Sequence, residues 1–188
     1  MRNKIKAWVS SKGTALLRRA GLREGQTVVD FGAGSGNYTV AAAKVTGKKG
    51  RVYAIDKNKG VLESLKKRLK EERIFNVSLI NAKGKIPLKD SSADAVLCYD
   101  IIHLVGPDET SRRHDRQRLY RCVKRVARRN ALVSFYPMHL DTHTELVSEK
   151  AVRKELEEDG FRFESEFHAE LIHDDEKTRG FIMNFRSA

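Results

Sequence analysis

The chain has 188 residues, of which 33% are charged, and its formal net charge is +12 at pH 7. This length suits one domain with a proper core and is too short for a catalytic domain plus a separate substrate domain. No apolar run approaches the roughly 18 residues of a membrane span, and no hydrophobic stretch follows the basic N-terminus as in a secretory signal. We therefore expect a cytoplasmic protein with one domain over 1–188, in which a helical lead-in over 1–24 precedes a core over 25–188.

Apolar periodicity predicts alternating strands and helices after a lead-in helix over 3–20 that is interrupted near Gly13. Strands are expected at 26–31, 51–56, 76–81, 94–99, 131–136, 161–170 and 179–186, and helices at 37–46, 58–73, 109–129 and 143–159. Alternating βα units favour a parallel sheet. No helix separates the last two strands, so we expect them to pair as a hairpin, with the acidic stretch 173–177 as its solvated turn.

Three glycines at alternate positions, Gly32, Gly34 and Gly36, follow the first predicted strand. Each costs roughly 0.5 to 1 kcal/mol relative to alanine, so three together indicate that something approaches the backbone closely. A strand, a glycine turn and a helix start place N–H groups and a positive helix end beside a ligand, which is typical of nucleotide sites. The dinucleotide pattern fails because its sixth position is Asn37, and the triphosphate loop fails because no Gly-Lys-Ser/Thr follows.

The second predicted strand ends in Asp56, 20 residues after Gly36. At this interval an open α/β sheet presents the acid of its second strand to ribose hydroxyls. A carboxylate there accepts hydrogen bonds from both hydroxyls of a cis-diol. A surface ion pair is the alternative role for Asp56.

Four stretches in this order resemble the class I S-adenosylmethionine (SAM) dependent methyltransferases: Asp-x-Gly-x-Gly-x-Gly over 30–36, Asp56, Asn81-Ala82, and the segment IPLKDSSADAVLCYDIIHLV. The resemblance covers roughly 22–140 and is nearest to the quinone-biosynthesis and small-molecule branch. It implies an α/β, single-domain, Rossmann-like three-layer sandwich with a seven-stranded, mostly parallel sheet and an antiparallel last strand. It also implies SAM as the cofactor.

The resemblance assigns SAM binding to Asp30, Gly32, Ala33, Gly34, Gly36, Tyr38, Asp56, Lys57, Asn81, Ala82, Tyr99 and Asp100. Asp30 either steers the SAM amino group through backbone or water or caps the glycine turn. Asn81, where the family commonly has aspartate, either accepts from the adenine amino group or is a turn residue. Tyr99 and Asp100 contact the methionine part or the substrate, or are the ordinary polar end of a strand. No catalytic residue is assigned, because methyl transfer from SAM mainly requires alignment and exclusion of water.

Histidines offer two further alternatives. His139, Asp141 and His143 supply three potential metal ligands or a general base, but Thr142 with Glu145 also forms a capping box that opens the next helix. We favour the cap and expect no metal. His103 either lines the site or packs at a helix end.

The segment 111–130 is strongly basic, with nine Lys or Arg and the single acid Asp115. A core stripe of Leu119, Cys122, Val123 and Val126 turns Arg118, Arg121, Arg125, Arg128 and Arg129 outward. Such a face suits RNA phosphates, an acidic lipid surface or solvent, and no interleaved aromatic residues support base stacking. The favoured function is SAM-dependent methyl transfer to a small-molecule acceptor. The alternatives are an RNA methyltransferase and a non-catalytic SAM-binding or RNA-binding subunit, and the oligomeric state is not predicted.

Overall fold

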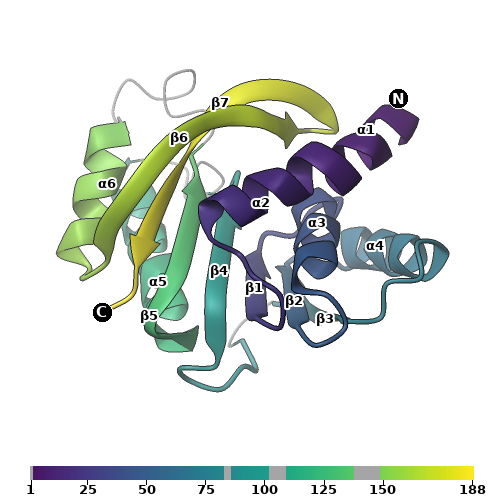
Figure 1. The fold of residues 1–188 in the computed structure, drawn as a ribbon. Helices are drawn as coiled ribbons and strands as arrows, with labels where there is room; N and C mark the ends of the chain where they lie inside the picture. The colour runs from purple at the N-terminus through teal and green to yellow at the C-terminus, as the bar shows by residue number, and fades with distance from the viewer. Residues whose placement is uncertain (1, 83–85, 102–108, 138–148) are drawn as a thin grey trace.

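The computed structural model describes residues 2–82, 86–101, 109–137 and 149–188. They form one seven-stranded sheet in the order β3-β2-β1-β4-β5-β7-β6 (Figure 1). The strands are β1 (Thr27–Phe31), β2 (Arg51–Asp56), β3 (Val77–Asn81), β4 (Ala93–Tyr99), β5 (Ala127–Tyr136), β6 (Arg162–His173) and β7 (Glu176–Arg186). The first five strands pair in parallel, and β7 runs antiparallel to both β5 and β6. The predicted mostly parallel sheet with an antiparallel last strand is therefore confirmed.

Helices cover both faces of this sheet and give the expected three layers. They are α1 (Arg2–Trp8), the π-helical turn η1 (Val9–Gly13), α2 (Thr14–Ala20), α3 (Asn37–Thr46), α4 (Lys59–Glu71), α5 (Glu109–Val126) and α6 (Glu149–Glu158). The lead-in helices, α3 and α4 pack in one core on one face, whereas α5 and α6 pack in a second core on the other. In Figure 1, α2 crosses in front of β4 and α5 lies behind β5.

The interruption expected near Gly13 is the π-helical turn η1. A Cβ at position 13 would lie 2.8 Å from the ring of Trp8, which is buried. Glycine therefore lets the indole pack against the lead-in backbone. This contact explains why the predicted helix is not regular along its length.

The largest differences from the predicted boundaries are at the end of α5, the start of β5 and the turn of the final hairpin. The helix expected over 109–129 ends at Val126, because β5 begins at Ala127 and already pairs with Ala93 of β4. The final hairpin is longer than expected, since β6 and β7 stay paired up to His173 and Glu176. The helix expected over 143–159 is described from Glu149 onward, and its predicted start lies outside the described residues.

The long hairpin reaches across the molecule to the lead-in helices (Figure 1). The Arg19 guanidinium lies 4.2 Å from the centroid of the Phe167 ring, and Lys12 pairs with Glu170 at 3.1 Å. The Tyr38 hydroxyl donates to the carbonyl of Ile172 at 3.1 Å. These contacts bring the hairpin tip to the edge of the sheet where β1, β2 and β4 end.

Candidate functional site

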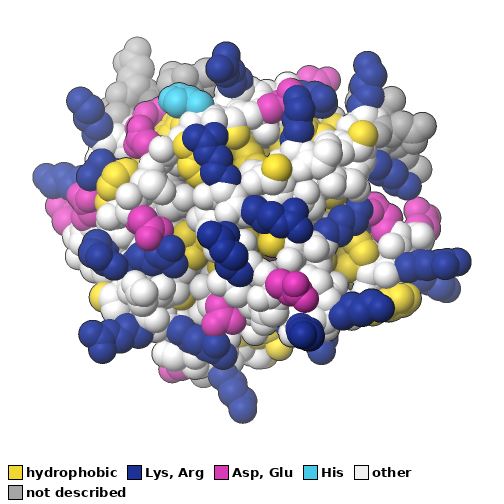
Figure 2. All heavy atoms as spheres, viewed as in Figure 1, with side chains coloured by type: hydrophobic (Ala, Val, Ile, Leu, Met, Phe, Trp, Pro, Cys, Tyr) yellow, Lys and Arg dark blue, Asp and Glu magenta, His cyan; other side chains and the backbone are white. Residues whose placement is uncertain are grey.

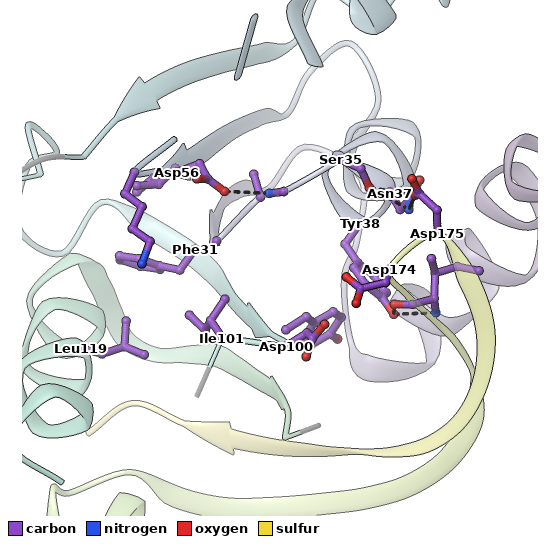
Figure 3. A pocket seen from close by; sticks show the side chains of 17 residues that line it. Phe31, Ser35, Asn37, Tyr38, Asp56, Asp100, Ile101, Leu119, Asp174 and Asp175 are labelled. Atoms are coloured by element: carbon purple, nitrogen blue, oxygen red, sulfur yellow. Dashed lines mark hydrogen bonds between the residues drawn. The ribbon is translucent and has the colours of Figure 1, made fainter. Parts of the chain in front are cut away.

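A cavity of about 450 Å³ opens at the carboxyl ends of β1, β2 and β4 (Figure 3). Its lining includes Phe31, Asp56 and Tyr99, which are the last residues of these three strands. The strand order reverses between β1 and β4, and ligands of open α/β sheets bind at such switch points. The volume lies within the usual range for small-molecule and cofactor sites.

The three glycines of the first turn have different structural reasons. All have positive φ angles, +72° at Gly32, +51° at Gly34 and +82° at Gly36, which side chains rarely adopt. A Cβ at Gly32 would lie 2.1 Å from Ile101 and one at Gly36 would lie 2.2 Å from Leu65. At Gly34 the nearest atom would be the Gly32 carbonyl oxygen at 3.8 Å. Packing within the protein therefore explains Gly32 and Gly36, whereas the Cβ position of Gly34 is open toward the cavity.

Asp56 is held at the mouth of the cavity by two backbone amides. The Gly34 N–H donates to Oδ2 at 2.9 Å and the Asn58 N–H donates to Oδ1 at 2.8 Å. Each carboxylate oxygen can accept a second hydrogen bond. The fixed carboxylate is thus compatible with two neighbouring hydroxyls of a ligand.

Asp30 lies beneath the glycine turn and not among the residues that line the cavity. Its side chain is buried and accepts a hydrogen bond from the Thr39 hydroxyl. Burial raises the pKa of Asp30 to about 7, the Thr39 hydrogen bond opposes that rise, and the charge of Asp56 adds to it. Asp30 can therefore act on a ligand through the turn and not by direct contact in this arrangement.

Asn81 and Ala82 are also absent from the cavity lining, as is Gly36. The Asn81 amide nitrogen donates to the carbonyls of Asp56 at 3.1 Å and of Lys57 at 3.0 Å. The Ala82 N–H donates to the same Asp56 carbonyl at 3.0 Å. Both residues thus hold the backbone that carries Asp56, and their contact with adenine stays a prediction.

Tyr38, Tyr99 and Asp100 line the cavity, and their contact with SAM stays a prediction. The two rings meet edge to face with centroids 4.7 Å apart, and burial raises the pKa of both phenols well above the ordinary value. Asp100 has a φ of +57°, and its N–H donates to the Tyr136 carbonyl at 2.9 Å. The end of β4 and the start of α3 therefore present two neutral phenols and a carboxylate at the cavity.

The tip of the β6–β7 hairpin is the part of the site that sequence reasoning missed. Asp174 and Asp175 line the cavity, so the interpretation of 173–177 as only a solvated turn is corrected. Asp175 Oδ1 accepts from Ser35 Oγ at 3.1 Å and from Asn37 Nδ2 at 2.9 Å. Asp174 and Asp175 occupy the two central turn positions with φ of +47° and +59°, where Asn-Gly is favoured. Two aspartates at such positions were the available signal.

The basic segment is largely engaged by the protein itself. Arg116 is buried and pairs with Glu155 at 2.7 Å. The buried side of the helix also includes Tyr120, whereas Leu119 and Cys122 of the expected core stripe are only half-buried. Arg125 pairs with Asp90 at 2.7 Å and donates to the carbonyls of Ile86 and Leu88. Arg128 pairs with Asp94 at 2.5 Å. Arg118, Arg121, Arg128 and Arg129 are exposed as expected, whereas Arg125 is half-buried. Arg125 and Arg128 are nevertheless held by carboxylates of the chain itself.

Basic side chains also occur well away from this segment. Figure 2 shows Lys and Arg spread over the face that carries the lead-in helices, with Asp and Glu between them.

The residues of the two histidine alternatives lie outside the described residues: His103, His139, Asp141, Thr142, His143 and Glu145. Among the helices that the structure describes, none is long and apolar enough to span a membrane.

Comparisons with known proteins agree with this geometry. The family model "Methyltransferase domain" matches residues 29–135. A curated relative, the probable cobalt-precorrin-6B C(15)-methyltransferase (decarboxylating) of Sulfurisphaera tokodaii, is 38% identical over 82 residues, which are 43% of each chain. The demethylmenaquinone methyltransferase of a Geobacillus species is 31% identical over 43% of this chain and 35% of its own length. The chain thus matches less than half the length of these two relatives.

Solved structures share the whole fold. A SAM-dependent methyltransferase from Aquifex aeolicus superposes with a TM-score of 0.74 at 24% identity, covering 100% of this chain and 99% of its own. A SAM-dependent methyltransferase from Methanosarcina mazei gives a TM-score of 0.71 at 16% identity, covering 92% and 96%. The match over 29–135 includes the glycine turn, Asp56 and the strands that frame the cavity. The chain therefore belongs to the methyltransferase-domain family and has the class I SAM-dependent methyltransferase fold.

Proposed function

We propose that this chain transfers a methyl group from SAM to a small-molecule acceptor. The observation that carries the proposal is the position of Gly34 beside Asp56 at the cavity of a methyltransferase-family fold. The Cβ position of Gly34 is open, so a ligand can approach the turn there. The residues present therefore suit the adenosyl part of SAM.

Each side of the cavity suits a different part of this cofactor. Asp56, fixed by its two backbone donors, would accept hydrogen bonds from the ribose hydroxyls. Phe31 and Leu119 lie on the Asp56 side in Figure 3 and would cover the adenine. The other predicted SAM contacts that line the cavity are Gly32, Ala33, Tyr38, Lys57, Tyr99 and Asp100. Asp30 and Gly36 would act through the shape of the turn, and contact of Asn81 and Ala82 with the adenine stays a prediction.

Bound SAM supplies an activated methyl group on a sulfonium leaving group, so the protein needs little acid–base chemistry. The main work of the chain would be alignment of acceptor and methyl group and exclusion of water. The fixed turn and the hairpin tip serve this purpose, because Tyr38 and Asp175 hold them together through hydrogen bonds to Ile172 and Asn37. Such ties limit movement at the cavity mouth.

The names of two curated relatives favour a small acceptor, because one is named as a cobalt-precorrin methyltransferase and the other as a demethylmenaquinone methyltransferase. The RNA alternative loses support because Arg125 and Arg128 have carboxylate partners within the chain. A cytoplasmic location stays a prediction from composition, and fractionation of cells that express a tagged chain tests it.

A screen of candidate acceptors with methyl-labelled SAM tests the proposed function. We expect label in a small molecule and an equal amount of S-adenosylhomocysteine (SAH), with neither product from the Gly34→Val variant. SAM binding with no transfer across corrinoid, quinone, amine and RNA acceptors would instead support the non-catalytic alternative. Transfer to RNA alone would identify the RNA methyltransferase.

A further inference from the structure

The cavity is acidic, although the chain as a whole is strongly basic. Its lining includes the carboxylates of Asp56, Asp100, Asp174 and Asp175, and Lys57 is the one basic residue among the described lining residues. Figure 3 shows Asp100, Asp174 and Asp175 together on the side away from Asp56. The net charge of +12 on the chain would not predict a negatively charged cavity lining.

The acidic side of the cavity is held in place by several contacts. His173 Nδ1 pairs with Asp100 Oδ2, which joins the hairpin to the end of β4. The Ile172 N–H donates to the Tyr38 hydroxyl at 3.0 Å, which joins the hairpin to the start of α3. The Asp174 carboxylate therefore stands on a supported turn, although its side chain is 89% exposed.

Local conformation places both carboxylates at the cavity. Asp100 and Asp174 adopt the left-handed backbone conformation, with φ of +57° and +47°. Aspartate is one of the few residues that tolerate this conformation, so the turn and the strand end can present acids there at low steric cost.

Two tyrosines give the same side a second affinity for cations. Tyr38 and Tyr99 line the cavity beside Asp100, and their rings lie in edge-to-face contact. Aromatic rings attract cations, including fully alkylated ones that cannot donate a hydrogen bond. Carboxylates together with aromatic rings therefore suit a sulfonium group.

We propose that this acidic side, formed by Asp100 and Asp174, selects SAM over SAH by the positive charge on sulfur. The inference rests on the proposed function, because a SAM molecule with its ribose on Asp56 would extend its sulfur and amino-acid part toward the opposite side of the cavity, where Asp100 and Asp174 lie. During transfer the acceptor's lone pair forms the new bond to the methyl carbon, and the electron pair of the broken S–C bond stays on sulfur. The sulfur loses its charge, so the product binds less well and exchanges for fresh SAM.

Calorimetric titration with three probes tests the inference: SAM, SAH, and sinefungin, in which a protonated amine replaces the sulfonium. The variant is Asp174→Asn, which removes the charge and keeps a residue that tolerates the left-handed conformation. All three probes carry the same amino-acid ammonium group, so the affinity ratio isolates the charge at the sulfur position: we expect the preference for SAM and for sinefungin over SAH to fall about two- to fivefold, as for an exposed charge pair. Added salt screens the charges, so it should also reduce the preference of the unmodified chain for SAM over SAH.

Glu176→Gln is the matched control, because it removes an exposed acid of the same hairpin that does not line the cavity. Its SAM-to-SAH affinity ratio should equal that of the unmodified chain. An unchanged ratio in Asp174→Asn, with both ligands bound, would overturn the inference and leave the proposed function standing. An equal change of this ratio in Asp174→Asn and Glu176→Gln would also overturn it, since the overall charge of the hairpin would then explain the effect. Failure of the unmodified chain to bind either ligand would reject both.

Discussion

The backbone amide of Gly34 donates to Oδ2 of Asp56 at 2.9 Å. This hydrogen bond joins the turn after β1 to the end of β2, so the glycine turn and the acid form one unit. The Gly32 and Ala33 amides add to it, because both donate to the Ile55 carbonyl, at 2.8 and 2.9 Å. The carboxylate thus has its position before any ligand arrives, which lowers the ordering cost of binding.

Replacement of Asp56 by alanine should weaken SAM binding at least tenfold, which corresponds to about 1.4 kcal/mol. The change removes the acceptor of the ribose hydroxyls and also releases the Gly34 amide. Calorimetric titration measures the affinity, and Glu63→Ala, an exposed acid of α4, is the control that should bind normally. Unchanged affinity together with a lower melting temperature would show that Asp56 is only a structural residue.

Valine at Gly34 should leave a folded chain that does not bind SAM, because its side chain would occupy the open side of the turn. Gly25→Val is the matched control, since Gly25 also has positive φ, at +81°, and has open space around its Cβ position. Both variants carry a similar backbone strain of roughly 1 to 2 kcal/mol. Only the Gly34 variant should lose binding, and equal loss in both would point to strain and not to ligand contact.

Asp30 should make the stability of the ligand-free chain fall as the pH rises from about 4 to about 7. Burial raises the pKa of Asp30 from its ordinary 3.8 to about 7, so the folded chain keeps a proton that the unfolded chain releases. The contribution is therefore fully present below pH 3.8 and is lost as the pH rises toward 7. It amounts to a few kcal/mol in order of magnitude.

The variant Asp30→Asn isolates this effect, because asparagine stays neutral and can still accept from Thr39. The difference in melting temperature between variant and unmodified chain should grow in favour of the variant between about pH 4 and pH 7, the range between the unfolded and folded pKa of Asp30. Parallel pH curves for the two proteins would show that Asp30 does not titrate in this range.

The triple replacement of Arg121, Arg125 and Arg128 by glutamine should lower stability and leave methyl transfer nearly unchanged. Arg125 and Arg128 lose their pairs with Asp90 and Asp94, so we expect a loss of about 1 to 2 kcal/mol in the free energy of unfolding. The single variant Arg121→Gln, at an exposed position, should stay within about 0.5 kcal/mol. Nanomolar RNA binding at physiological salt that the triple variant abolishes would contradict the small-molecule proposal.

Local patterns predicted the sheet and the centre of the site. The short β-branched runs that end in Phe31 and Asp56 belong to strands paired in parallel. Such strands are buried on both faces, so their apolar runs can be recognised without knowledge of their partners. The absence of a helix before the last strand predicted the hairpin. Spacing alone also placed Asp56 at the cavity, because adjacent parallel strands end at the same edge.

What the sequence did not indicate depends on contacts between distant segments. The acidic turn reaches the cavity because Tyr38 binds Ile172, which is 134 residues away in the chain. Arg116 is buried because Glu155 of another helix pairs with it, whereas helical periodicity identifies only the apolar residues of that face. Gly32 and Gly36 have the same sequence pattern as Gly34, yet Ile101 and Leu65 explain them. Periodicity carries no information on such partners.

Titration of SAM and of NAD into the unmodified chain by calorimetry tests the central claim most directly. The fixed Asp56 carboxylate beside an open Gly34 predicts heat and a single site with SAM, and no binding with NAD, whose glycine pattern this turn does not match. Asp56→Ala in the same experiment shows whether the heat arises at this cavity. Tight binding of NAD with no heat from SAM would contradict the account.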